Sequence, residues 1–96
     1  MNNKDLINSI ENLRKKINKE AIPYCNERIE FIINNKIESP DEIEKILDSL
    51  LDYIGVGCGI DEFKKLNSYY TTIHKKNSEC YNQSYNELYG EGVGYL

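Results

Sequence analysis

The sequence predicts an all-α protein, a compact bundle of four helices, or of five if Pro23 divides the first helix. Apolar residues recur at intervals of three and four along most of the chain, which is the period of a helix with one buried face. No stretch alternates apolar and polar residues between turn signals, as the strands of a hairpin do. Because 96 residues suit one hydrophobic core, we expect a single helical domain over residues 1–89. The aperiodic residues 90–96 are expected to form a flexible C-terminal tail.

The first helix is predicted by an apolar stripe whose residues are separated by four, three and four positions, with one more beside them: Leu6, Ile10, Leu13, Ile17 and Ile7. Such a stripe needs a partner surface that covers it. Asn3 or Asp5 can accept hydrogen bonds from the free N–H groups at the helix start.

Pro23 interrupts this helix because it has no backbone N–H and its ring clashes with the carbonyl of Lys19 in a straight helix. It also disfavours the helical conformation of Ile22. We therefore predict a break or a strong kink near residues 20–23. The stripe resumes beyond the proline, so one long kinked helix is the alternative: Cys25, Ile29, Ile32 and Ile33.

The clearest helix start is at Ser39, which can act as the cap while Pro40 fits the first helical position and Glu42 completes a capping box. The helix that follows, over residues 40–54, has a broad apolar stripe and is expected to be central, touching more than one neighbour. Gly55 is the expected left-handed residue at its end.

The glycine-rich stretch 55–59 is predicted to be a turn, after which Asp61 can cap a helix over residues 61–76. Lys75 and Lys76 then lie near its C-terminal end, where the helix dipole favours positive charge. Asn77 or Ser78 is the expected boundary before the last helix.

Composition narrows the function classes. The net charge of −4 opposes non-specific binding to nucleic acid. No apolar run reaches the length of a membrane-spanning helix, and we expect no membrane association and no signal peptide. The odd number of cysteines, three, suits free thiols in a reducing compartment, so we expect a cytoplasmic protein.

No motif identifies a catalytic, cofactor, metal or small-molecule site. Cys25, Cys58, Cys80 and His74 have zinc-binding atoms but no paired spacing, and Cys25 shares its helical face with apolar residues. Cys58, flanked by glycines, is expected to be the more exposed thiol. We expect a protein without enzymatic activity.

Tyrosine is unusually abundant, with eight copies. Four of the C-terminal ones form a candidate partner surface, because tyrosine offers a large contact area with a hydrogen-bonding tip: Tyr69, Tyr81, Tyr85 and Tyr89. The alternative is that these rings are half-buried at the edge of the core.

Two further hypotheses concern nucleic acid. Residues 40–54, the glycine turn and residues 61–76 can form a helix-turn-helix whose candidate nucleic-acid face contains Lys64, Lys65, Lys75 and Lys76. The acidic residues between Glu38 and Glu62 can instead imitate phosphate charge and inhibit a nucleic-acid enzyme.

The run from Ile43 to Asp52, followed by Glu62–Leu66 and the pair Tyr69-Tyr70, resembles short uncharacterised proteins carried on mobile elements of AT-rich Gram-positive bacteria. The resemblance covers about the second half of the chain and contains no catalytic motif. It implies a helical accessory protein. The leading prediction is a non-enzymatic protein-interaction or regulatory module that presents its tyrosine-bearing C-terminal helices or its acidic helix to a protein. Self-association through the tyrosines is the simplest version of this prediction.

Overall fold

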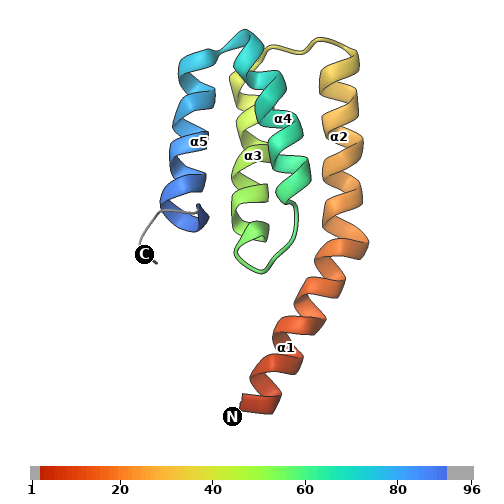
Figure 1. Ribbon diagram of the computed structural model, residues 1–96. Helices are drawn as coiled ribbons and strands as arrows, with labels where there is room; N and C mark the ends of the chain where they lie inside the picture. The colour runs from red at the N-terminus through yellow and green to blue at the C-terminus, as the bar shows by residue number, and fades with distance from the viewer. Residues whose placement is uncertain (1–2, 91–96) are drawn as a thin grey trace.

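The computed structural model describes residues 3–90 as helices joined by short turns. The helices are α1 (Asn3–Lys16), α2 (Ile22–Asn34), α3 (Pro40–Ile54), α4 (Ile60–Ile73) and α5 (Lys75–Tyr89), and a π-helical turn, η1 (Ile17–Ala21), joins α1 to α2. No strand occurs in this range, so the all-α prediction is confirmed. Since α1, η1 and α2 are one continuous helix, the bundle has four helices that run alternately up and down (Figure 1). The predicted tail, apart from Gly90, lies outside the described residues.

The break predicted near Pro23 is wrong, whereas the kink is present slightly earlier. Lys16, Ala21 and Ile22 all keep right-handed helical angles, and the Ile22 N–H donates to the Ile17 carbonyl five residues back. A π turn widens the helix by one residue per turn and so accommodates a proline that has no N–H to donate. The long helix bends at this turn without ending (Figure 1).

The predicted start of α3 is confirmed. The Ser39 hydroxyl accepts a hydrogen bond from the Glu42 N–H at 3.4 Å, and Pro40 occupies the first turn. The Glu42 carboxylate accepts a hydrogen bond from Arg28 Nη2 of α2 at 3.1 Å. The cap therefore also links two helices.

Gly55 is not the left-handed residue predicted, because its φ is −58°. The chain continues for two more residues, and Gly57, with φ of 86°, takes that role. The Cys58 N–H donates to the Tyr53 carbonyl at 3.0 Å and the Gly57 N–H to the Ile54 carbonyl at 2.9 Å. This pair of hydrogen bonds is the Schellman motif, centred two residues later than the sequence pattern indicated.

The starts of α4 and α5 also differ from the predictions. Gly59, with φ of 90°, precedes α4, which begins at Ile60, so Asp61 lies inside the first turn and is not the cap. The chain leaves the helical conformation at His74, with φ of −140°. Lys75 and Lys76 therefore begin α5 and do not end α4.

The core lies between all four helices of the bundle. Its fully buried members include Ile29 of α2, Leu47 of α3, and Leu66 and Tyr70 of α4. Helix α3 packs against α2 and α4, as expected for a helix with a broad stripe, while α4 contacts α2, α3 and α5. By contrast, α1 contains no buried residue and extends beyond the turn at residues 55–59 (Figure 1). We call this end of the bundle, formed by residues 55–60 and the last turn of α5, the loop end.

Candidate functional site

The four tyrosines predicted to form a partner surface are turned toward the bundle. Tyr69, Tyr81 and Tyr85 are half-buried against the core, and Tyr89 is 37% exposed. Three of the hydroxyls donate hydrogen bonds within the fold, to the Ile37 carbonyl at 2.7 Å, to Asp48 Oδ1 at 2.6 Å and to the Leu51 carbonyl at 3.0 Å. Tyr85 stacks on Phe63 with 5.6 Å between ring centroids. The structure brings Tyr81, Tyr85 and Tyr89 along one face of α5, but that face packs on α3 and α4.

Two tyrosine hydroxyls donate hydrogen bonds to carboxylates of α3. Tyr70, which is fully buried, donates to Glu44, and Tyr81 donates to Asp48. Burial raises the pKa of Tyr70 to about 12, and the hydrogen bond to Glu44 acts in the same direction. Burial and the hydrogen bond to Asp48 raise the pKa of Tyr81 as well, and burial raises that of Tyr69. All three phenols therefore stay neutral over the physiological range.

The four lysines of the candidate nucleic-acid face are exposed but point in different directions. Lys65 forms an ion pair with Glu30 of α2, whereas Lys64 borders a hollow between α4 and α5. Lys75 and Lys76 lie beyond the interruption at His74, on another helix. The structure does not gather them on one helix face.

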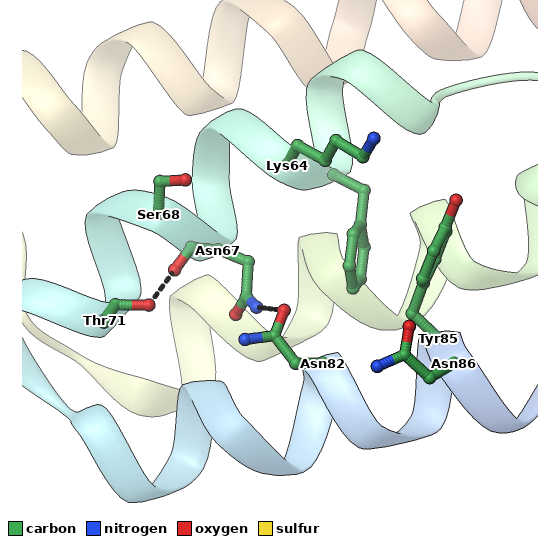
Figure 2. Close-up of a pocket in the computed structure, with 8 residues that line it drawn as sticks. Lys64, Asn67, Ser68, Thr71, Asn82, Tyr85 and Asn86 are labelled. Carbon is green, nitrogen blue, oxygen red and sulfur yellow. Dashed lines mark hydrogen bonds between the residues drawn. The ribbon is translucent and has the colours of Figure 1, made fainter. Parts of the chain in front are cut away.

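The hollow that Lys64 borders lies between α4 and α5 (Figure 2) and has a volume of about 330 Å³. Its lining is mainly polar: Phe63, Lys64, Asn67, Ser68, Thr71, Asn82, Tyr85 and Asn86. At its floor, Asn67 Nδ2 donates to Asn82 Oδ1 at 2.9 Å and Thr71 Oγ1 donates to the Asn67 carbonyl at 2.9 Å. The sequence suggested Asn67 only as a polar residue of the helix-turn-helix alternative and did not indicate Asn82, because isolated amides carry no periodic signal.

Asn67 and Ser78 are the two buried polar residues of the described chain. Ser78 Oγ donates to Asn67 Oδ1 at 3.0 Å, and Asn67 Nδ2 also donates to the Ser78 carbonyl at 3.2 Å. No buried side-chain nitrogen or oxygen in residues 3–90 lacks a hydrogen-bond partner. These groups fix how α5 packs on α4, because a shift of one helix along the other would leave amides unpaired. Ser78, which the sequence predicted as a helix boundary, lies inside α5 and contributes to the packing of α5 on α4.

The cysteines do not form a site within the described residues. Cys25 is buried, as expected, and burial raises the pKa of its thiol. The expectation that Cys58 is exposed is wrong: it is 2% exposed because the Schellman turn folds it under α1, where its thiol approaches the Arg14 carbonyl at 3.8 Å. Cys80 is the exposed thiol. Between residues 3 and 90, no three His, Cys, Asp or Glu side chains are grouped as metal ligands are.

The feature that sequence reasoning missed is the exposure of α1. Leu6, Ile7, Ile10 and Leu13 are 50%, 54%, 38% and 48% exposed, and we call these four residues the α1 face. The helix lengths expected from the sequence could have predicted this exposure. If Pro23 does not end the first helix, that helix spans residues 3–34, about 48 Å, whereas the other helices span about 22 Å. Part of it must then overhang the bundle.

The overhanging helix is held in place at its last turn. Arg14 Nε donates to the Val56 carbonyl at 2.8 Å, and its guanidinium lies beside Gly57. One turn later, Ile17 is buried in the core. The α1 face is therefore presented in a defined direction by a helix fixed to the loop end.

The described residues contain no helix that is both long enough and apolar enough to cross a membrane. Comparison of the whole chain with known families, curated proteins and solved structures gives no match. The resemblance to mobile-element proteins stays a prediction.

Proposed function

We propose that this chain is a non-enzymatic protein-interaction module of the cytoplasm that docks through the α1 face. The observation that carries the proposal is the exposure of four adjacent apolar side chains on a helix without a single buried residue. Covering them removes apolar surface from water, which favours binding by about 1 kcal/mol for each half-exposed side chain. All three cysteines are free, which supports a reducing compartment.

The tyrosine surface, the acidic helix and the lysine face give weaker support to the functions predicted for them. The tyrosine hydroxyls are used inside the fold, so the tyrosine surface offers a partner few free polar tips. The acidic helix α3 has three carboxylates bonded to Arg28, Tyr70 and Tyr81. The lysines of the nucleic-acid alternative are divided between two helices, α4 and α5. Among the described residues, the α1 face groups four exposed apolar side chains on one helix.

The test compares two double variants with the same change of charge. Leu6→Lys with Ile10→Lys disrupts the α1 face, whereas Asn8→Lys with Asn12→Lys alters the opposite side of the same helix. Because α1 has no buried residue, both variants should keep the far-UV circular dichroism of the wild type. Proteins captured by the tagged chain from bacterial lysate, including further copies of itself, should be lost with the first variant and kept with the second. Equal capture by both variants contradicts the proposal.

A further inference from the structure

The exposed apolar residues are concentrated around α1. Nine large hydrophobic side chains are exposed among the described residues, and seven of them belong to α1 or the loop end. Besides the α1 face, these are Ile60 at the start of α4 and Leu88 and Tyr89 at the end of α5. Tyr89 lies at the loop end because its hydroxyl bonds to the Leu51 carbonyl and approaches Gly55. Most of the large exposed apolar side chains of the described residues therefore lie on α1 or at the loop end.

The α1 face has the repeat of a helix that packs along another helix. Leu6, Ile10 and Leu13 alternate steps of four and three residues, which is the 3.5-residue average of a coiled-coil seam. The α1 face can also pair with an identical face on an antiparallel helix. Leu6 of one copy then meets Ile10 of another, and Ile10 meets Leu6.

The position of the bundle limits what can reach this face. Ile17 continues the same stripe and is buried in the core, so the α1 face continues the core-facing side of this helix beyond the bundle. Because α1 extends beyond the turn at residues 55–59 (Figure 1), a helix that covers the α1 face lies beside this overhanging part of the chain.

The direction of that helix follows from the same geometry. A second α1 running parallel to the first would lead its own α2 into the first bundle. An antiparallel α1 leads away from it, and a two-fold axis then places the start of each α1 against the loop end of the other copy.

Charge favours a second copy as the occupant. Residues 3–21 carry five basic and three acidic side chains, whereas residues 22–96 carry seven basic and thirteen acidic. The overhanging helix of one copy is thus net positive and the bundle of the other net negative, so the two attract each other.

We propose that the α1 face binds the same face of a second copy, forming a two-fold symmetric dimer with antiparallel α1 helices. This inference rests on the proposed function, since it names the partner of the same surface. The seam from Leu6 to Leu13 spans little more than one heptad, so the dimer is weak, with a Kd roughly in the micromolar range.

The first experiment measures mass by light scattering and sedimentation over a concentration series that brackets the micromolar range. The wild type should change from monomer to dimer. Ile10→Lys should raise the dimer Kd by about tenfold or more, because it buries a charge in the seam. The matched control Asn8→Lys, on the opposite side of α1, should change the Kd by about twofold at most. A wild type that stays monomeric, or a dimer that Ile10→Lys leaves intact, overturns the inference.

The second experiment tests orientation with spin labels at Ser9→Cys and at Lys16→Cys, two equivalent positions beside the seam. The exposed Cys80 is replaced by Ser, while Cys25 and Cys58 are buried. In an antiparallel dimer the axial offset between like labels grows by about 20 Å from position 9 to position 16. Equal distances at both positions mean parallel helices and overturn the proposed arrangement.

The two proposals fail in different ways. A monomeric wild type that still captures other proteins through the α1 face ends the dimer inference and leaves the interaction function in place. Binding of the monomer to anionic phospholipid vesicles, lost with Ile10→Lys, assigns the face to lipid and overturns both.

Discussion

Helices α1 and α3 are built on similar apolar stripes and have nearly the same length, 14 and 15 residues, yet α3 buries five residues and α1 none. The difference lies in their neighbours. Helix α3 has α2 and α4 along its length, whereas α1 continues a helix that is longer than the bundle. Periodicity thus indicates which side of a helix is apolar, but the lengths of the surrounding helices decide whether that side is covered.

The sharpest way to test this comparison is the same substitution in each helix. Leu47→Ala in α3 removes a fully buried side chain and should cost about 2–5 kcal/mol of unfolding free energy. Leu13→Ala in α1 removes a side chain that is 48% exposed and should cost less than about 1 kcal/mol at concentrations where the chain is monomeric. Urea denaturation followed by circular dichroism measures both. Similar losses at the two positions would contradict the exposure of α1.

Alkaline pH should lower the free energy of unfolding, because two tyrosine hydroxyls donate hydrogen bonds to carboxylates of α3. Tyr70 has a pKa of about 12 in the fold against 10.0 in a free side chain. Below pH 10 the Tyr70 phenol keeps its proton in both the folded and the unfolded chain, so its full contribution to stability is present. Above pH 10 the unfolded chain releases it first, so stability falls until folded Tyr70 also titrates, a loss of about 3 kcal/mol. The Tyr81 pKa is raised in the same direction.

The readout is the urea midpoint measured between pH 8 and pH 11.5. Tyr81→Phe should reduce the alkaline fall, because it removes one of the phenols whose pKa burial raises. Tyr24→Phe, an exposed ring on α2, should leave the profile of the wild type unchanged. A flat profile in the wild type would mean that the phenols are no harder to ionise in the folded chain.

The turn at residues 55–59, which follows α3 and accepts a hydrogen bond from Arg14 of α1, provides a smaller effect. Gly57 has a φ of 86°, which costs other residues about 1–2 kcal/mol, so Gly57→Ala should destabilise the protein by that amount. Gly55 has an ordinary helical φ, although a methyl group there lies 3.1 Å from the Tyr89 hydroxyl. Gly55→Ala should therefore cost less, and the ranking is read from denaturation midpoints. The reverse ranking would restore Gly55 as the left-handed residue.

The sequence patterns predicted the helical fold, the cap at Ser39 and the burial of Cys25, because these depend on local spacing and residue type. They misplaced Gly55, Asp61 and the boundary at His74 by one to four residues, since several adjacent residues can end a helix and tertiary contacts select among them. The network around Asn67 and the exposure of α1 depend on which helices lie together and how far each extends. Neither property is encoded in the period of one segment.

The smallest expected effect compares two serines, one at the start of α3 and one in the middle of α1. Ser39 caps α3 through the Glu42 N–H, so Ser39→Ala should cost about 1 kcal/mol. Ser9 donates to the Asp5 carbonyl four residues back, a bond that competes with the helix ladder. Ser9→Ala should leave the urea midpoint unchanged within about 0.5 kcal/mol and slightly raise the helical signal, because alanine has the higher helix propensity. A loss at Ser9 as large as that at Ser39 would mean that α1 depends on this hydroxyl, and that the overhang is held by more than its continuity with α2.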